Sequence, residues 1–250
     1  MTVAVPLAEH AVARLVATTA VRLVHDWGLV SVPAVLDRAR ALATVPLTDQ
    51  TAWHVVAALP RTRWLDREQS WFSFTESLGR LDAALDKIFA VIDRDRPVCE
   101  TLPAIRFDEL RAALGRSLIG AREAPAPVLR RCLVELTSCT ILPATGHRAP
   151  DKLSSSLVSR AHPFIDEHSD RVPPLTHPEA VVVHLLAEAG GELDPKTLRL
   201  RARDAGVART TVNELIKWSP LLAPVVSPPL ALTVRRVRLV GHRPRTAGVR

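Results

Sequence analysis

Apolar residues recur along this chain mostly at the three-to-four-residue spacing of amphipathic helices, and seldom at the alternating spacing of strands. Near the N-terminus this spacing predicts helices over 11–27, 33–42 and 49–59. Gly28 suits the end of the first helix, Pro33 the first turn of the second, and Thr48 the cap of the third. Two aromatic-rich runs, 63–65 and 71–74, then flank a polar loop, which predicts a β-hairpin. Three helices followed by a hairpin are typical of a winged helix-turn-helix.

The same order recurs twice more along the chain. The next predicted elements are helices over 81–92, 107–114 and 127–136 with a wing in 139–149, and helices over 178–189, 195–205 and 208–218 with a hairpin around Pro228 and Pro229. The third helices begin near residues 49, 127 and 208, at a nearly constant spacing. We therefore expect a mainly α fold of tandem winged helix-turn-helix domains with small β-hairpin wings. The expected parts are winged helices at 9–76, 80–152 and 177–241, a proline-containing polar linker at 153–176, and a basic tail at 242–250.

The third unit carries the sharpest local pattern. Ala202 is a small residue where two helices would cross closely, and Gly206 follows four residues later, where the turn needs a left-handed residue. Val212 and Leu215 then stand at the spacing of buried anchors on the second helix of the motif. Because these constrained positions agree with one another, we expect a helix-turn-helix here.

The outward face of that second helix presents side chains that can recognise DNA. Its candidate DNA-binding residues are Arg209, Thr210, Asn213 and Lys217. Arginine can bond the O6 and N7 atoms of guanine, asparagine can bond adenine, and threonine or lysine can hold phosphates. Glu214 on the same helix would accept a hydrogen bond from cytosine or repel non-cognate backbone.

The expected wing over 230–239 adds Arg235, Arg236 and Arg238 to the candidate DNA-binding residues. Alternation of apolar residues with arginine places Arg236 and Arg238 on one face of the strand, suited to phosphates or a minor groove. The alternative is a protein-binding winged helix whose arginines are only solvated.

Charge supports the C-terminal location of this surface. The 250 residues carry a net charge of +7, but residues 199–250 hold eleven basic and two acidic residues, so the rest of the chain is net negative. A concentrated positive charge favours a polyanionic partner, most simply double-stranded DNA. The first unit differs, because its third helix shows Asp49, Gln50 and His54 and no Arg or Lys, and its aromatic residues suit a core. It is expected to be structural or protein-binding, and the second unit, with Arg130 and Arg131, is intermediate.

Several other classes of function lack the residues they need. The chain has no tyrosine, which excludes tyrosine nucleophiles, and no glycine-rich phosphate loop or dinucleotide fingerprint. Cys132 and Cys139 are too far apart for usual zinc spacing, and the polar string over 162–170 suits a solvated linker. Three cysteines indicate a reducing compartment. The longest apolar run, 180–187, already contains His184 and is far shorter than the about 20 residues of a membrane helix. We expect a cytoplasmic, non-catalytic protein with no cofactor, metal or membrane partner.

The run TRWLDREQSWFSF at 62–74, with LDKIFAVI at 85–92 and FDELRAAL at 107–114, resembles a group of bacterial proteins. These carry sigma-factor region 4-like or HARE-type winged helix-turn-helix domains, and the resemblance spans residues 20–140. It implies a winged-helix fold and a link to DNA or to the transcription machinery. Together with the residue patterns, it predicts a DNA-binding protein for transcription regulation or DNA targeting. The alternative is a protein-interaction adaptor that docks on RNA polymerase or on a larger DNA-associated complex.

Overall fold

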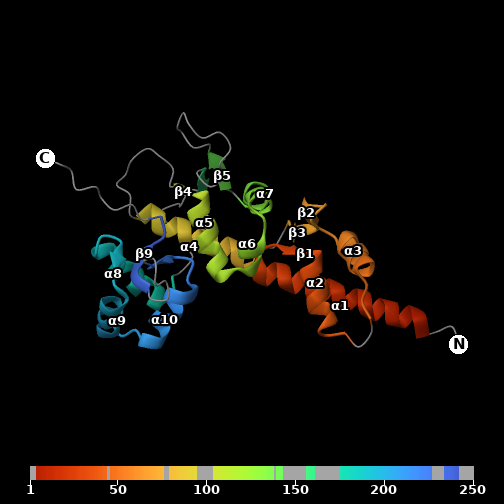
Figure 1. Ribbon diagram of the computed structural model, residues 1–250, viewed down its shortest axis with the longest axis horizontal. Coiled ribbons are helices and arrows are strands. Elements are labelled where there is room, and N and C mark those ends of the chain that lie inside the picture. The colour runs from red at the N-terminus through yellow and green to blue at the C-terminus, as the bar shows by residue number, and fades with distance from the viewer. Residues whose placement is uncertain are drawn as a thin grey trace, which may run out of the picture. The chain divides into compact units, whose positions relative to one another are not determined.

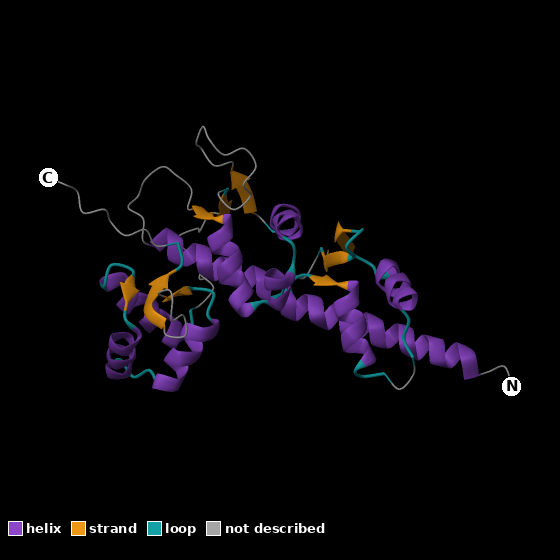
Figure 2. Ribbon diagram, viewed as in Figure 1, coloured by secondary structure: helices purple, strands orange, loops and turns teal. Residues whose placement is uncertain are grey.

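The computed structural model describes residues 4–43, 46–75, 79–94, 104–137, 139–142, 156–160, 175–226 and 234–241. Within these ranges the protein is mainly helical and contains three small antiparallel sheets of three strands each (Figures 1 and 2). This confirms the expectation of a mainly α fold with small β elements. None of the helices in the described part of the chain has both the length and the apolar composition that a membrane span requires.

The first repeat contains α1 (Ala4–Trp27), β1 (Val30–Ser31), α2 (Val32–Arg40), α3 (Asp49–Ala58), β2 (Thr62–Asp66) and β3 (Trp71–Phe74). The helix and hairpin predictions for this region are confirmed, although α1 begins earlier than predicted. The Thr48 hydroxyl caps α3 by accepting a bond from the Thr51 N–H at 3.1 Å. Gly28, the residue after α1, has a left-handed backbone with a φ of +81°. In the sheet, β3 lies between β1 and β2.

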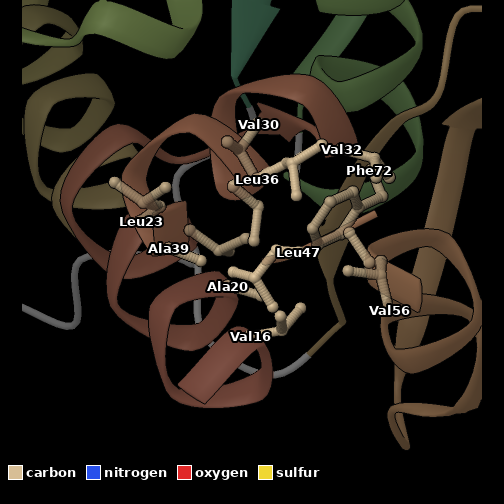
Figure 3. Close-up of a cluster of buried hydrophobic side chains, with 13 residues drawn as sticks. Val16, Ala20, Leu23, Val30, Val32, Leu36, Ala39, Leu47, Val56 and Phe72 are labelled. Atoms are coloured by element: carbon tan, nitrogen blue, oxygen red, sulfur yellow. The ribbon is translucent and has the colours of Figure 1, made fainter. Parts of the chain in front are cut away.

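The core of this repeat lies where α1, α2 and α3 meet the sheet (Figure 3). Phe72 is fully buried there, and the rings of Trp53, Trp64 and Phe74 are partly buried against the cluster. Trp53 and Trp64 stack with their ring centroids 5.2 Å apart, and the Arg67 guanidinium lies 5.2 Å from the Trp53 ring centroid. These aromatic residues pack the core and the hairpin, as predicted, and Arg67 covers the stack.

The second repeat contains α4 (Arg80–Arg94), β4 (Ala104–Arg106), α5 (Phe107–Ser117), α6 (Ile119–Glu123), α7 (Ala126–Leu136), β5 (Cys139–Leu142) and β6 (Leu157–Arg160). The linker predicted at 153–176 is wrong over 157–160, because β6 forms the central strand between β4 and β5. Val158 is fully buried there and pairs with Ile105 and Ile141. The predicted wing over 139–149 is a strand over its first residues, and the rest of it lies outside the described residues.

The third repeat contains α8 (His177–Glu188), β7 (Glu192–Leu193), α9 (Pro195–Asp204), α10 (Arg209–Trp218), β8 (Leu222–Val226) and β9 (Val234–Leu239). We call residues 177–241 the C-terminal module. Its sheet has the order β7-β9-β8, so the last strand again lies in the middle. The three predicted helices are confirmed with small shifts at their ends. The predicted basic tail at 242–250 and the tip of the hairpin lie outside the described residues.

The contacts of the chain group into two compact units, which do not coincide with the three repeats. Unit 1 combines residues 1–82 with 118–137, and unit 2 combines 83–117 with 138–250. The second repeat therefore contributes α6 and α7 to unit 1, and most of α4, α5 and its whole sheet to unit 2. The domain boundaries drawn from the repeats stay a prediction.

In unit 1, α6 and α7 pack against the first repeat. Arg131 on α7 donates to the Leu65 carbonyl oxygen at 3.0 Å, and the Glu135 carboxylate accepts from both Arg131 and Arg63. The bond from Arg131 lowers the pKa of Glu135; burial opposes it, and with the bond from Arg63 the pKa remains below its usual value. Arg131 thus makes its contacts with Leu65 and Glu135 within unit 1.

In unit 2, polar contacts join α4 and α5 to the C-terminal module. The Lys87 ammonium lies 2.8 and 2.9 Å from the two carboxylate oxygens of Glu179 on α8. The Arg116 guanidinium donates to the Ile216 carbonyl oxygen near the end of α10, and burial lowers the pKa of Arg116 to about 10. The Glu109 carboxylate accepts from the Gly241 N–H at 2.9 Å. These contacts fix the C-terminal module to α4 and α5.

Candidate nucleic-acid interface

The start of α9 is set by Asp194 and Pro195. The Asp194 carboxylate accepts bonds from the N–H groups of Lys196 at 3.0 Å and Thr197 at 2.9 Å, and Pro195 occupies the first turn, where a missing N–H costs nothing. The bonds from Thr197, first from its side chain and then from its backbone, lower the pKa of Asp194 below its usual value. The carboxylate therefore remains ionised and holds the end of the helix at neutral pH.

The turn between α9 and α10 is closed by two backbone bonds. The Val207 N–H donates to the Ala202 carbonyl at 2.8 Å, and the Gly206 N–H donates to the Arg203 carbonyl at 2.9 Å. This pair of bonds commonly ends a helix that is followed by a left-handed residue. Gly206 is that residue here, with a φ of +83°. Ala202 and Val207 are both buried beneath the turn. The left-handed conformation predicted for Gly206 is confirmed.

Replacing Gly206 by alanine is expected to destabilise the C-terminal module by about 1–2 kcal/mol, the usual cost of a left-handed conformation in an L-residue with a side chain. A Cβ atom at this position meets nothing within 4 Å, so the backbone angle is the whole cause of the loss. Gly206→Asn should lose less, since asparagine visits this region more readily. Urea denaturation followed by circular dichroism measures both variants. An alanine variant as stable as the parent would contradict the expectation.

The inner face of α10 is anchored by Val212 and Ile216, both buried. The prediction that Leu215 is a buried anchor is wrong, because Leu215 is only half-buried. Residues four apart on a helix lie nearly in line, so Ile216 continues the row begun by Val212 and Leu215 falls at the edge of that row. The anchoring row fixes which side of α10 faces outward.

The outward side of α10 carries the predicted DNA-binding residues. Arg209, Thr210, Asn213 and Lys217 are all exposed, together with Glu214. Arg209, Asn213 and Lys217 follow one another at four-residue steps and therefore form one stripe along the helix. Within the described residues, no side chain caps the N-terminus of α10 and its first turn holds no acidic residue. The backbone N–H groups there are thus placed to receive an anion.

Two residues of this stripe have side-chain partners inside the module. The amide oxygen of Asn213 accepts a bond of 2.8 Å from the Nε of Arg199 on α9. The Lys217 ammonium lies 4.6 Å from the centroid of the Trp218 ring. Arg199 was missed among the sequence-predicted site residues. Its signal was its position three residues before Ala202, which places it on the side of α9 that faces α10.

The wing residues lie on β9, which packs against α8 and α9. Val225 pairs with Arg236 and Val226 with Val234, so Arg235 is the extra residue of a β-bulge, and its side chain is exposed. Arg236 is exposed and lies 3.6 Å from the Glu192 carboxylate on the neighbouring strand.

Arg238 differs from the other predicted wing contacts. It is half-buried, and among the described residues its Nε atom is enclosed without a hydrogen-bond partner. Its neighbours Val237 and Leu239 are buried, as the alternation along β9 predicts. Arg235 and Arg236 are therefore better exposed for contact with phosphate than Arg238.

The other candidate metal ligands of the sequence lie only partly in the described residues. In the ranges that the structure describes, no three His, Cys, Asp or Glu side chains come together as a metal site would require. Cys132 and Cys139 are both buried. The polar string over 162–170 lies outside the described residues.

A relative of known function would indicate what this surface binds. Comparison with protein-family models, curated proteins and solved structures finds no match for this chain. A function is therefore inferred from the α9–α10 pair and from the cations exposed on α10 and β9.

Proposed function

We propose that this chain is a non-catalytic protein that binds double-stranded DNA through α10 and the β8–β9 hairpin, in transcription regulation or DNA targeting. The observation that carries the proposal is the orientation of α10. Buried Val212 and Ile216 fix its inner side, so the stripe of Arg209, Asn213 and Lys217 faces outward. A helix presented in this way has the dimensions and the donors needed to read a major groove.

The proposed fold of each repeat is a winged helix-turn-helix. Its support is the order of elements: the first and third repeats run helix, strand, helix, helix and two strands, and the second adds the short helix α6 to this order. In all three repeats the last strand takes the middle of the sheet. In the C-terminal module the buried Ala202 and the left-handed Gly206 also agree with a helix-turn-helix. The resemblance of residues 20–140 to sigma-factor region 4-like and HARE-type domains agrees with the same proposal.

Electrostatics supports DNA as the partner of this surface. Residues 199–250 hold eleven basic and two acidic residues, so their field attracts a phosphate backbone and makes binding dependent on salt. The uncapped N-terminus of α10 adds backbone donors for a phosphate. Arg209 stands in the first turn of α10, beside these donors.

Variants of the two surfaces should weaken DNA binding in different ways. Arg209→Ala should lower affinity for the preferred duplex by roughly tenfold and relax preference at one base pair, because arginine contacts guanine with two bonds. Arg236→Ala should weaken binding to all sequences alike and flatten the dependence of log affinity on log salt by about one unit for the lost phosphate contact. Fluorescence anisotropy against salt, on a duplex selected from a random library and on random duplex, measures both effects.

Arg38→Ala is the matched control for these variants. Arg38 is exposed on α2 in unit 1, so its replacement removes the same charge far along the chain from the proposed surface. It should leave both the affinity and the salt slope nearly unchanged. If folded Arg209→Ala and Arg236→Ala bind duplex like the parent, the C-terminal module is not the DNA-binding surface.

A protein-interaction adaptor is the second candidate, and two exposed apolar residues favour it. Trp218 at the end of α10 is 48% exposed and Leu200 on α9 is 44% exposed. Exposed tryptophan is common at the energetic centres of protein interfaces. If the arginine variants bind DNA normally while Trp218→Ala abolishes co-elution with RNA polymerase, the adaptor function replaces DNA binding.

A further inference from the structure

A contact between α9 and α10 controls one residue of the proposed DNA-reading stripe. Arg199 is half-buried on α9, and its Nε donates to the amide oxygen of Asn213 at 2.8 Å. Asn213 itself is exposed on α10. Its side-chain amide is therefore tied to a neighbouring helix, whereas an exposed asparagine ordinarily samples several orientations.

The chemistry of the pair determines which way the amide faces. A guanidinium group carries donors and no acceptor, so it can meet the oxygen of an amide and not its NH₂ group. With its oxygen toward Arg199, Asn213 directs its two N–H donors away from that contact. Reversing the amide would place donor against donor, which costs the bond and adds repulsion.

We propose that Arg199 is a positioning residue that sets the base preference of Asn213. This inference rests on the proposed function, because it concerns the same DNA-reading surface. Asparagine distinguishes bases by the placement of its oxygen and its NH₂ group, since one accepts and the other donates. When the orientation is fixed before binding, one base edge fits. When the amide rotates, it can satisfy several edges and the preference is lost.

Three variants separate this role from a simple loss of charge. Arg199→Ala removes both the charge and the donor. Arg199→Gln removes the charge but keeps an amide N–H donor at the same number of bonds from Cα as the arginine Nε. Arg201→Ala is the matched control, because Arg201 is exposed and stands two residues along α9, on a different side of the helix.

The experiment measures the affinity of the full chain for a duplex selected from a random library and for its single-base-pair variants. Arg199→Ala and Asn213→Ala should relax the same base pair, each by about tenfold, and the double variant should relax it no further. Arg199→Gln should keep the preference. Arg201→Ala should weaken binding to all sequences alike, with its preference unchanged. Thermal denaturation by circular dichroism verifies that each variant is folded.

The outcomes distinguish this inference from the proposed function. If the parent binds the selected duplex and Asn213→Ala relaxes one base pair while Arg199→Ala does not, the positioning role is wrong and DNA binding stands. An Arg199→Gln variant that behaves like Arg199→Ala also overturns it, because the donor is then not the cause. If the parent shows no sequence preference at any salt concentration, the specific reading of DNA fails and the positioning role fails with it.

Discussion

Replacing Lys87 by methionine is expected to lower the free energy of unfolding of unit 2 by about 3 kcal/mol, the lower end of the range for breaking a buried ion pair. The Lys87 ammonium contacts both carboxylate oxygens of Glu179, and the two side chains are only 24% and 9% exposed. Among the described residues, the buried carboxylate without Lys87 keeps its bonds from the N–H and the hydroxyl of Thr176. The loss is large because a charge remains buried without its counter-charge.

The same substitution should change how stability depends on pH. Burial raises the pKa of Glu179, but the bonds from Lys87 and Thr176 together hold it below its usual value. A carboxyl with a lowered pKa contributes stability that is complete above its unfolded pKa and is lost as the pH falls through the folded pKa. In Lys87→Met, burial still raises the pKa of Glu179, but the ammonium group that lowered this pKa is absent. The variant should therefore lose less of its stability than the parent between about pH 7 and about pH 3.

Urea denaturation followed by hydrogen exchange of the α8 segment measures this prediction. Tryptophan fluorescence is less suitable, because Trp27, Trp53, Trp64 and Trp71 lie in unit 1 and only Trp218 lies in unit 2. Lys196→Met is the control, since Lys196 is exposed on α9. Equal protection of α8 in Lys87→Met and Lys196→Met would show that the ion pair does not hold the C-terminal module to α4.

Gly120→Ala should destabilise unit 1 by about 2–3 kcal/mol, as overpacking of a close contact does. A Cβ atom on Gly120 would lie 2.0 Å from the Leu29 carbonyl oxygen and 2.7 Å from that of Trp27. These are backbone atoms and cannot rotate aside, so α6 has to move away from the end of α1. The direction of this change in stability is informative, because helix propensity alone would make alanine more stable than glycine by about 1 kcal/mol.

Tryptophan fluorescence in a urea titration suits the Gly120 variant, because four of the five tryptophans report on unit 1. Gly190→Ala serves as the comparison. Gly190 lies in unit 2, and a Cβ there meets nothing within 4 Å. Its replacement should therefore leave the urea concentration at which unit 1 unfolds unchanged. A Gly120→Ala variant that unfolds at a higher urea concentration than the parent would show that α6 does not press on the end of α1.

The parts of the fold that the sequence predicts are those set by neighbouring residues. Thr48, Pro33 and Gly206 act within one helical turn of their own positions, and the structure confirms the helices that they mark. The strand β6 was missed because its partner β4 is distant in sequence and a stretch without a strand pattern separates it from its other partner, β5. Its apolar residues, Leu157 and Val158, are too few to stand out from the polar stretch around them.

In the candidate site too, the sequence predicts what depends on neighbouring residues and misses what depends on distant ones. Helical spacing alone places Arg209, Asn213 and Lys217 on one outward stripe, as the structure has them. Leu215 and Ile216 are adjacent and both apolar, so spacing could not decide which of them is the deeper anchor. The enclosure of the Arg238 Nε depends on what surrounds the strand in three dimensions, and the Arg199–Asn213 bond depends on the crossing of two helices.

The two units have a consequence for the order in which the protein can be completed during synthesis. The chain enters unit 2 at residue 83, returns to unit 1 at 118 and leaves it again at 138. When residue 117 has emerged from the ribosome, unit 1 still lacks α6 and α7, while α4 and α5 have emerged before the module that they contact. Unit 1 therefore lacks part of its chain until the first segment of unit 2 has been synthesised. In a nascent chain, α4 and α5 therefore lack their contacts with α8 and α10 until those later helices have been synthesised.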